Sequence, residues 1–221
     1  RSSGDLVIRD RATINGSVSN TGTDKGSVAI IGSTVTSAIS DESDNNITII
    51  DSVINGTDTT TDDVVALIGA KPYENLDSAI SEAQAGDTIE LLKDIDDVTG
   101  GEGNTKGRFK IEKDLTLNGN GHTIQAGEGF TEGTSIFNIE SGANVSITNL
   151  HINSNNLAKH GLNINNAGKV TLNNVEIING TATAITNNGS KVTATGLKTS
   201  DNAWGAVNVD DAESLFTLTS G

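Results

Sequence analysis

The sequence predicts an all-β solenoid, a fold in which short parallel strands stack rung upon rung around one elongated core. Three observations predict it. A pattern of alternating apolar and polar residues recurs along the 221-residue chain with a spacing of about 22 residues. One position of the pattern carries Asn or Gly, the residues that tolerate a left-handed backbone. Aromatic residues make up only 3% of the chain, yet Val, Ile and Leu recur in short alternating runs, which favours strands over disorder.

The first predicted block, residues 1–57, repeats one strand pattern three times. The copies read LVIRD, VAIIG and ITIID and begin at Leu6, Val28 and Ile47. Each copy ends in a residue type that suits a bend between strands, namely Asp10, Gly32 and Asp51. We interpret the block as a short solenoid of its own or as the last rungs of a preceding one.

A polar linker at residues 58–63 separates this block from a domain predicted for residues 64–221. That domain begins with a strand at residues 64–68. Apolar residues then fall at helical spacing, at Leu76, Ala79, Ile80 and Ala83. Asn75 is placed to cap the start of this helix and Gly86 to end it. A strand at residues 88–92 follows, and we expect the helix to cap the open end of the solenoid.

The clearest repeats lie in the C-terminal half. They read VSITNLHI, VTLNNVEI and VTATGLKT at residues 145–152, 170–177 and 192–199, with an earlier copy at residues 115–119 and a degenerate one from Leu215. Alternation with period two places Val170 and Leu172 on the buried face of a strand and Thr171 on the other face. We expect Val175 and Ile177 to be buried as well and Glu176 to be exposed. One rung cannot enclose a core alone, so the rungs must stack to bury these residues.

Two columns of small polar residues mark the predicted corners. The bend column, where we expect a left-handed backbone, contains Gly119, Asn149, Asn174 and Gly196. A second strand precedes each copy, and the residues that follow these strands form the column Glu140, Asn165, Asn187 and Asp210. The next column contains Ser141, Asn166, Asn188 and Asp211. We interpret Asn149, Asn174, Gly196, Asn165, Asn187 and Asp210 as structural ladder residues.

Two stretches carry a resemblance to a known fold family. One runs from Tyr73 through the helical residues to Leu91, and the other is LTLNGNGHTI at residues 115–124. Both resemble the N-terminal cap of pectate-lyase-like right-handed parallel β-helix proteins. The resemblance implies a right-handed parallel β-helix with one short capping α-helix for residues 64–221, and it is weaker for residues 1–57. Proteins of this fold include secreted or cell-surface adhesins and polysaccharide lyases and hydrolases, so the fold does not define an activity.

Composition restricts the partners and the kinds of site that the chain can form. The formal net charge of −15 disfavours nucleic acid and anionic lipid, because like charges repel. No apolar run reaches the length of a membrane span. The chain has no cysteine, which excludes disulfides and thiolate metal sites. It begins at Arg1 and ends in what reads as the middle of a repeat, so we expect a processed or excised segment.

The candidate catalytic pair is Asp210 and Asp211, because hydrolases of the resembling fold use clustered aspartates. Both lie in columns that Asn occupies in other rungs, which favours a corner role. Arginine occurs only at Arg1, Arg9, Arg11 and Arg108, and we expect none in the main solenoid body, which disfavours a lyase. The histidines lack metal-ligand spacing and are expected to be structural or surface residues: His122, His151 and His160. No catalytic residue is predicted.

Two acidic clusters are weak candidates for calcium. Asp94, Asp96 and Asp97 precede a glycine-rich loop, but the position where a calcium loop requires Glu is Thr105. The second cluster is Asp41, Glu42 and Asp44. A solvated loop is the favoured interpretation of both, so no cofactor is predicted. Trp204, the single tryptophan, fills the core or presents an exposed ring for a ligand or subunit contact.

Two function classes follow. The first is a non-enzymatic extracellular or cell-surface protein with a structural or adhesive role, for which head-to-tail assembly into a fibre is one option. Its partners would be copies of itself, a host or cell surface, or a glycan. The alternative is a carbohydrate-active enzyme or a carbohydrate-binding module on the same scaffold. An enzyme would show acids and a cation converging in a groove on one face.

Overall fold

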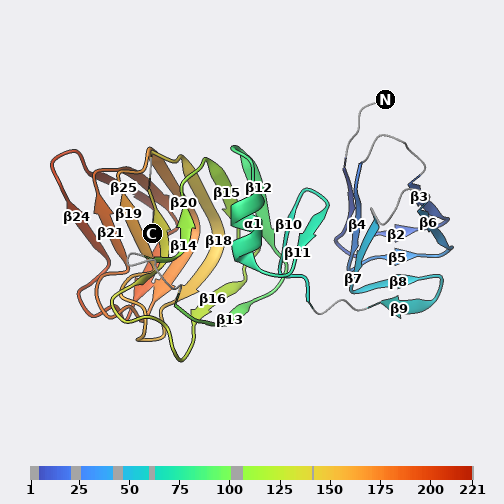
Figure 1. The fold of residues 1–221 in the computed structure, drawn as a ribbon, viewed down its shortest axis with the longest axis horizontal. Helices are drawn as coiled ribbons and strands as arrows, with labels where there is room; N and C mark the ends of the chain where they lie inside the picture. Colours follow the sequence, from blue (N-terminus) through green and yellow to red (C-terminus); the bar gives the residue numbers. More distant parts are fainter. Residues whose placement is uncertain are drawn as a thin grey trace. The chain divides into compact units, whose positions relative to one another are not determined.

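The computed structural model describes residues 5–20, 26–41, 47–59, 63–100, 107–140 and 142–220. It is an all-β parallel solenoid of about eight turns with 4% helix, which confirms the predicted fold class. The chain divides into two compact units, Arg1–Asn75 and Leu76–Gly221 (Figure 1). The linker expected at residues 58–63 lies partly outside the described residues. No helix among the described residues is long and apolar enough to span a membrane.

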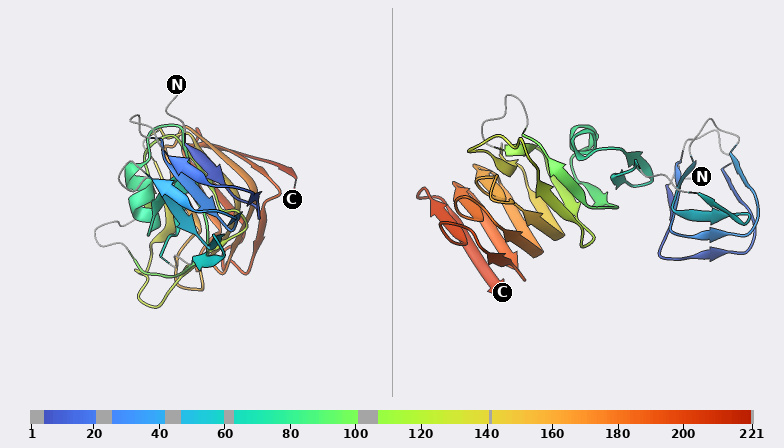
Figure 2. Two further views of the ribbon diagram at one scale, coloured as in Figure 1. Left: turned by 90° about the vertical axis from the view of Figure 1, so that its right-hand side faces the viewer. Right: turned by 90° about the horizontal axis from the view of Figure 1, so that it is seen from below.

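The C-terminal unit wraps three parallel sheets around its core, and successive rungs stack side by side (Figure 2). The first sheet contains β14 (Gly107–Ile111), β17 (Ser135–Ile139), β19 (Leu162–Asn165), β21 (Ile185–Asn188) and β24 (Val207–Asp210). The second contains β12 (Asp87–Leu91), β15 (Leu115–Asn118), β18 (Val145–Asn153), β20 (Lys169–Ile178), β22 (Lys191–Thr195) and β25 (Leu215–Ser220). β13 (Ile95–Val98), β16 (Thr123–Ala126) and β23 (Lys198–Ser200) form the third sheet with the distal halves of β18 and β20.

The rung register on the second sheet is the predicted one. Val170 pairs with Val145 on one side and with Val192 on the other. The predicted core residues Val170, Leu172, Val175 and Ile177 are all at most 1% exposed. Thr171 and Glu176, expected to be exposed, are half-buried because neighbouring rungs flank their side chains on both sides. Burying such continuous apolar columns is the main favourable term in the stability of the unit.

One rung of the first sheet differs from the prediction by one residue. Leu162 pairs with Ile185, so Asn165 pairs with Asn188 and not with Asn187. Asn188 then pairs with Asp210. The assignment of Asn187 to the ladder is therefore wrong: its side chain points inward and is fully buried. The cause is a polar residue at a core position, which shifted the apparent alternation in the sequence.

The bend column adopts the expected backbone in three of its four members. Asn149, Asn174 and Gly196 have φ values of 50°, 53° and 63°. Gly119 is not in the left-handed region, and its small size serves another purpose. A Cβ there would lie 2.5 Å from the carbonyl oxygen of Asn149 and 2.8 Å from the Cα of Leu150. Glycine at this position permits the close approach of two rungs.

The helix α1 (Leu76–Glu82) forms where helical spacing predicted it and buries Leu76, Ala79 and Ile80. The helix ends at Glu82, four residues before the predicted stop at Gly86, which instead lies with a φ of 92° in the turn before β12. α1 packs beside β14, the first strand of the first sheet. Lys113 donates hydrogen bonds to the carbonyls of Ser81 and Ala83, 2.9 Å each, at the C-terminal end of the helix.

The N-terminal unit is a smaller solenoid. Three parallel strands, β1 (Leu6–Ile8), β4 (Val28–Ile31) and β7 (Ile47–Ile50), pair in the predicted register, and Asp10, Gly32 and Asp51 have positive φ. The remaining sides contain β2 (Thr13–Ile14), β5 (Thr34–Val35) and β8 (Ser52–Ile54), and β3 (Val18–Asn20) with β6 (Ile39–Asp41). β9 (Thr57–Thr59) folds back antiparallel on β8. Further along the chain, a hairpin of β10 (Ala66–Ile68) and β11 (Lys71–Tyr73) includes part of the strand predicted at residues 64–68.

Candidate functional site

Amide side chains form hydrogen-bonded ladders along the corners of the C-terminal unit. Asn174 Nδ2 donates to Asn149 Oδ1 at 3.0 Å, and Asn149 Nδ2 donates to Asn118 Oδ1 at 3.4 Å. On the first sheet, Asn188 Nδ2 donates to Asn165 Oδ1 at 2.9 Å. Asn149 thus accepts from one rung and donates to another, and Asn165 does the same by donating to Asn138 Oδ1 at 3.0 Å, so these ladders hold rungs together.

Asp210 and Asp211 lie at the next position along the first-sheet corner. Both are exposed, and Asp210 Oδ1 accepts a hydrogen bond of 3.0 Å from the backbone N of Asp211. Asp211 has a φ of 79°, a left-handed conformation that suits a corner residue. The Ser214 hydroxyl donates to the backbone carbonyl of Asp210. These contacts are those of a turn.

A different group of charges converges beside α1. Asp77, Ile80, Ser81, Arg108, Lys110, Glu112 and Lys113 line a hollow of about 350 Å³, which we call the charged hollow. Arg108 lies in β14, so the expectation that arginine is absent from the solenoid body is wrong. Sequence reasoning missed this group because Asp77 and Arg108 are far apart in the chain and meet only through the packing of α1.

Every cation of the charged hollow already has an intramolecular partner. Arg108 forms a two-point ion pair with Asp77, with Nη2 to Oδ2 at 2.7 Å. Lys110 Nζ lies 2.8 Å from both Glu112 Oε1 and Glu140 Oε1. These hydrogen bonds raise the pKa of Lys110 to about 12. The amine therefore stays protonated at neutral pH and is unsuited to act as a base.

The part of the first calcium candidate that the structure describes has one engaged carboxylate and two exposed ones. Asp94 Oδ1 accepts from the backbone N of Thr123 at 2.9 Å and lies 3.1 Å from His122 Nδ1. The Thr123 hydrogen bond, more than His122, lowers the pKa of Asp94. Asp96 and Asp97 are exposed, and among the described residues no group of three or more His, Asp or Glu side chains is placed to hold a metal. Glu42 and Asp44, from the second cluster, lie outside the described residues.

The histidines occupy three different environments. His122 and His151 lie on the surface beside carboxylates, with His151 Nδ1 2.7 Å from Glu176 Oε2. His160 is buried, and its Nδ1 lies 2.7 Å from the carbonyl oxygen of Thr183. Burial lowers the pKa of His160, which favours the neutral ring donating to that carbonyl.

Trp204 is 73% exposed, so the interpretation that it fills the core is wrong. Trp204 lies on the loop before β24, and its backbone N donates to the carbonyl of Ala182 at 3.2 Å. The exposed ring is compatible with the other interpretation, a contact with a ligand or a subunit.

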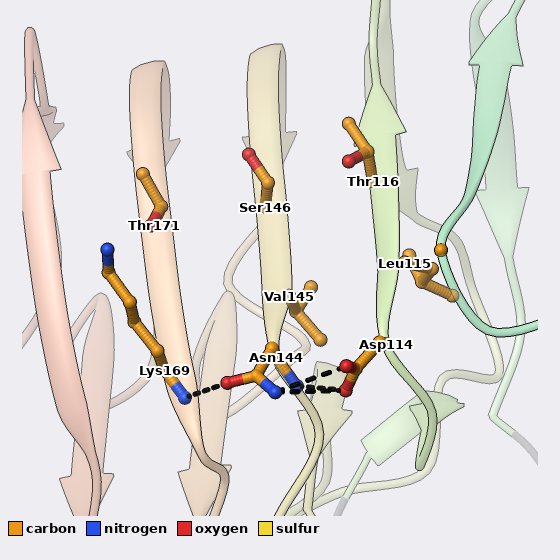
Figure 3. Close-up of a pocket in the computed structure, with 9 residues that line it drawn as sticks. Asp114, Leu115, Thr116, Asn144, Val145, Ser146, Lys169 and Thr171 are labelled. Carbon is orange, nitrogen blue, oxygen red and sulfur yellow. Dashed lines mark hydrogen bonds between the residues drawn. The ribbon is translucent and has the colours of Figure 1, made fainter.

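A shallow groove of about 280 Å³ lies on the outward face of the second sheet (Figure 3). Three hydroxyl residues from adjacent strands line it: Thr116, Ser146 and Thr171. Asp114, Asn144 and Lys169 form one edge, and we call the whole the hydroxyl groove. Asn144 donates from its backbone N to Asp114 Oδ1 at 2.7 Å and accepts at Oδ1 from the backbone N of Lys169 at 3.1 Å.

The signal for this groove was present in the repeats. The alternation that buries Val170 and Leu172 also places Thr171 and its equivalents outward, in register.

Comparison of the chain with protein-family models, curated proteins and solved structures finds no match in any of the three. The chemistry of both sites must therefore be inferred from their own residues.

Proposed function

We propose that this chain is a non-enzymatic module of an extracellular or cell-surface protein, with a structural or adhesive role. The observation that carries the proposal is the pairing of charges in the charged hollow. Arg108 is bound to Asp77, and Lys110 is bound between Glu112 and Glu140. The cluster binds α1 to the first rung, and its groups are engaged with one another.

The acids elsewhere support the same proposal. Asp94 is engaged by Thr123 and His122, and Asp114 is engaged by Asn144. Asp210 and Asp211 lie in a turn and are exposed. A hydrolase needs two carboxylates on either side of a bound sugar, with the pKa of one raised so that it can donate a proton. The pKa shifts at Asp94 and Asp114 are in the opposite direction.

The resemblance of residues 73–91 and 115–124 to secreted and surface β-helix proteins supports the location. The edges of the sheets support self-association as one mode of action. Among the described residues, β25 has a partner on one side only and exposes Leu215 and Leu218, at 54% and 55%. β1 likewise has one partner and exposes Leu6 at 48%. Such edges accept further strands, which would join copies head to tail.

A carbohydrate-active enzyme is the second candidate, because the charged hollow brings acids and cations onto one face. One experiment separates the two. The purified chain is incubated with neutral and acidic polysaccharides, and the reducing ends released are measured. We expect no turnover above background. Turnover that is lost in Glu140→Gln, or in the double variant Asp210→Asn with Asp211→Asn, would identify an enzyme.

The same preparation tests self-association. Sedimentation velocity over a range of protein concentrations should show species larger than the monomer. Thr217→Lys, which places a charge on the outer face of the edge strand β25, should shift the distribution to the monomer. Thr193→Lys, a charge of the same kind on the interior strand β22, serves as the matched control. A strictly monomeric chain at the highest concentration would exclude head-to-tail assembly.

A further inference from the structure

The outward face of the second sheet carries an unbroken column of hydroxyl side chains. The strand register aligns one residue from each strand: Thr88, Thr116, Ser146, Thr171, Thr193 and Thr217. Adjacent strands lie about 4.8 Å apart. The hydroxyls therefore repeat at that interval in the direction in which the rungs stack, and three of them line the hydroxyl groove (Figure 3).

The hydroxyls of the groove are available to a ligand. Thr116, Ser146 and Thr171 are half-buried, and their hydroxyls form no hydrogen bond with other described residues. A second outward column on the same strands, which contains Thr148 and Thr195, behaves differently. Thr148 Oγ1 donates to Asn118 Oδ1 at 3.3 Å, and the hydroxyls of Thr195 and Thr219 lie 3.0 Å apart. One column is thus engaged within the protein, while the column in the groove keeps both its donors and its acceptors free.

The edge of the groove supplies groups of both charges. The hydrogen bonds from the backbone and side chain of Asn144 lower the pKa of Asp114, so this carboxylate is ionised at neutral pH. Lys169 supplies an ammonium two rungs away on the same edge. A ligand with vicinal hydroxyls satisfies such a lining, because each hydroxyl both donates and accepts. A polyanion is disfavoured by the net charge of −15.

We infer that the hydroxyl groove binds a neutral, extended β-linked polysaccharide that runs across the rungs, along the hydroxyl column. The length of one sugar residue in such a chain is close to the strand spacing, so successive sugars meet equivalent hydroxyls on successive rungs. The groove volume of about 280 Å³ is near the lower end of ligand clefts, about 300 Å³, and fits a contact with a few sugar residues. The inference rests on the proposed adhesive role and names its ligand class.

The test is calorimetric titration of the full chain with four neutral oligosaccharides, the hexamers of cellulose, xylan, mannan and chitin, and with polygalacturonate as an anionic comparator. We expect binding to at least one neutral hexamer, without cleavage. Thr171→Arg should weaken that binding at least about tenfold by filling the groove. Thr171→Val keeps the shape and the strand preference and should weaken it about fivefold, the effect of losing one hydrogen bond.

Asn208→Arg is the matched control, because it adds the same side chain at an exposed position of β24, on the first sheet. Its affinity should equal that of the unmodified chain. Binding to none of the neutral hexamers, binding to polygalacturonate alone, or an equal loss in Asn208→Arg would each overturn the inference. Binding with cleavage that Thr171→Arg abolishes would support the groove and overturn the non-enzymatic role. Absence of both binding and cleavage would overturn the proposed polysaccharide site and leave the non-enzymatic role standing.

Discussion

The two solenoids of this chain use the same rung pattern but differ in how many rungs have neighbours on both sides. In the β1–β4–β7 sheet of the N-terminal unit, β4 lies between two strands, and its first three residues are buried. Its neighbours β1 and β7 bury one residue each. In the C-terminal unit β18 and β20 are both interior and bury every second residue along most of their length. Burial of a rung is therefore a property of its neighbours as much as of its own sequence.

The units also differ in how they cover a free edge. In the N-terminal unit, β9 folds back on β8 through Asn55 and Gly56, whose φ values of 49° and 78° are those of a tight hairpin. In the C-terminal unit, a helix packs beside β14 and Lys113 binds its last carbonyls. Both devices serve to protect backbone groups that would otherwise pair with another chain.

The largest expected effect comes from placing a charge in an interior rung. Leu172→Asp should destabilise the C-terminal unit by more than about 4 kcal/mol, because the carboxylate would be buried without a partner. Ile30→Asp should unfold only the N-terminal unit. Calorimetry should then show two separable transitions, each removed by one variant. Thr171→Asp, one residue away but outward, is the control and should cost only about 1 kcal/mol, because Asp has a low strand propensity but its carboxylate stays hydrated there. Loss of both transitions in either variant would show that the units do not unfold independently.

A smaller effect distinguishes two uses of glycine. Gly119→Ala should cost about 1–3 kcal/mol, because the new Cβ meets backbone atoms of the next rung. Gly32→Ala should cost about 1–2 kcal/mol for a different reason, the left-handed φ of 53° in otherwise open space. Asn tolerates that conformation but is larger than Ala. Urea denaturation should therefore show Gly32→Asn recovering stability and Gly119→Asn losing more. Recovery in Gly119→Asn would contradict the steric explanation.

The smallest effect is a pH dependence confined to the C-terminal unit, which contains all three histidines. Burial lowers the pKa of His160 from 6.5, so below about pH 6.5 the unfolded chain binds a proton that the folded chain does not. Stability should be complete above that pH and decline as the pH falls toward the folded pKa. His160→Gln should flatten this slope in melting experiments, and the transition of the N-terminal unit should not show it. An unchanged slope would assign the effect to other groups.

The carboxylates act in a separate window. The pKa values of Asp94 and Asp114 are lowered from 3.8, so their contribution is present above that pH and is lost as the pH falls through the folded values.

The rungs, the bends and the helix could be predicted because each leaves a local pattern. Period-two alternation placed Val170 and Leu172, and helical spacing placed Leu76 and Ile80. The exceptions have physical causes. Asn187 occupies a core position with a polar side chain, which displaced the predicted register by one residue. Gly119 is required by its distance to the next rung, which composition does not reveal.

The candidate sites were harder to predict because they depend on packing between distant segments. Arg108 meets Asp77 only where α1 lies against β14. The hydroxyl groove requires the register of three strands, although its residues already recur in the repeats. The exposure of Trp204 followed from neither pattern nor composition, because a single residue has no periodicity.

The repeated register has a consequence for how such a chain changes length over evolutionary time. Because Val145 pairs with Leu115 and with Val170, removing residues 145–169 would bring Val170 into the place of Val145 with every inward residue still facing inward. A duplication of the same segment would insert a rung equally cleanly. Unequal recombination within the gene can therefore lengthen or shorten the molecule in whole rungs. Each event would also add or remove one hydroxyl of the column, so the reach of that surface and the length of the chain would vary together.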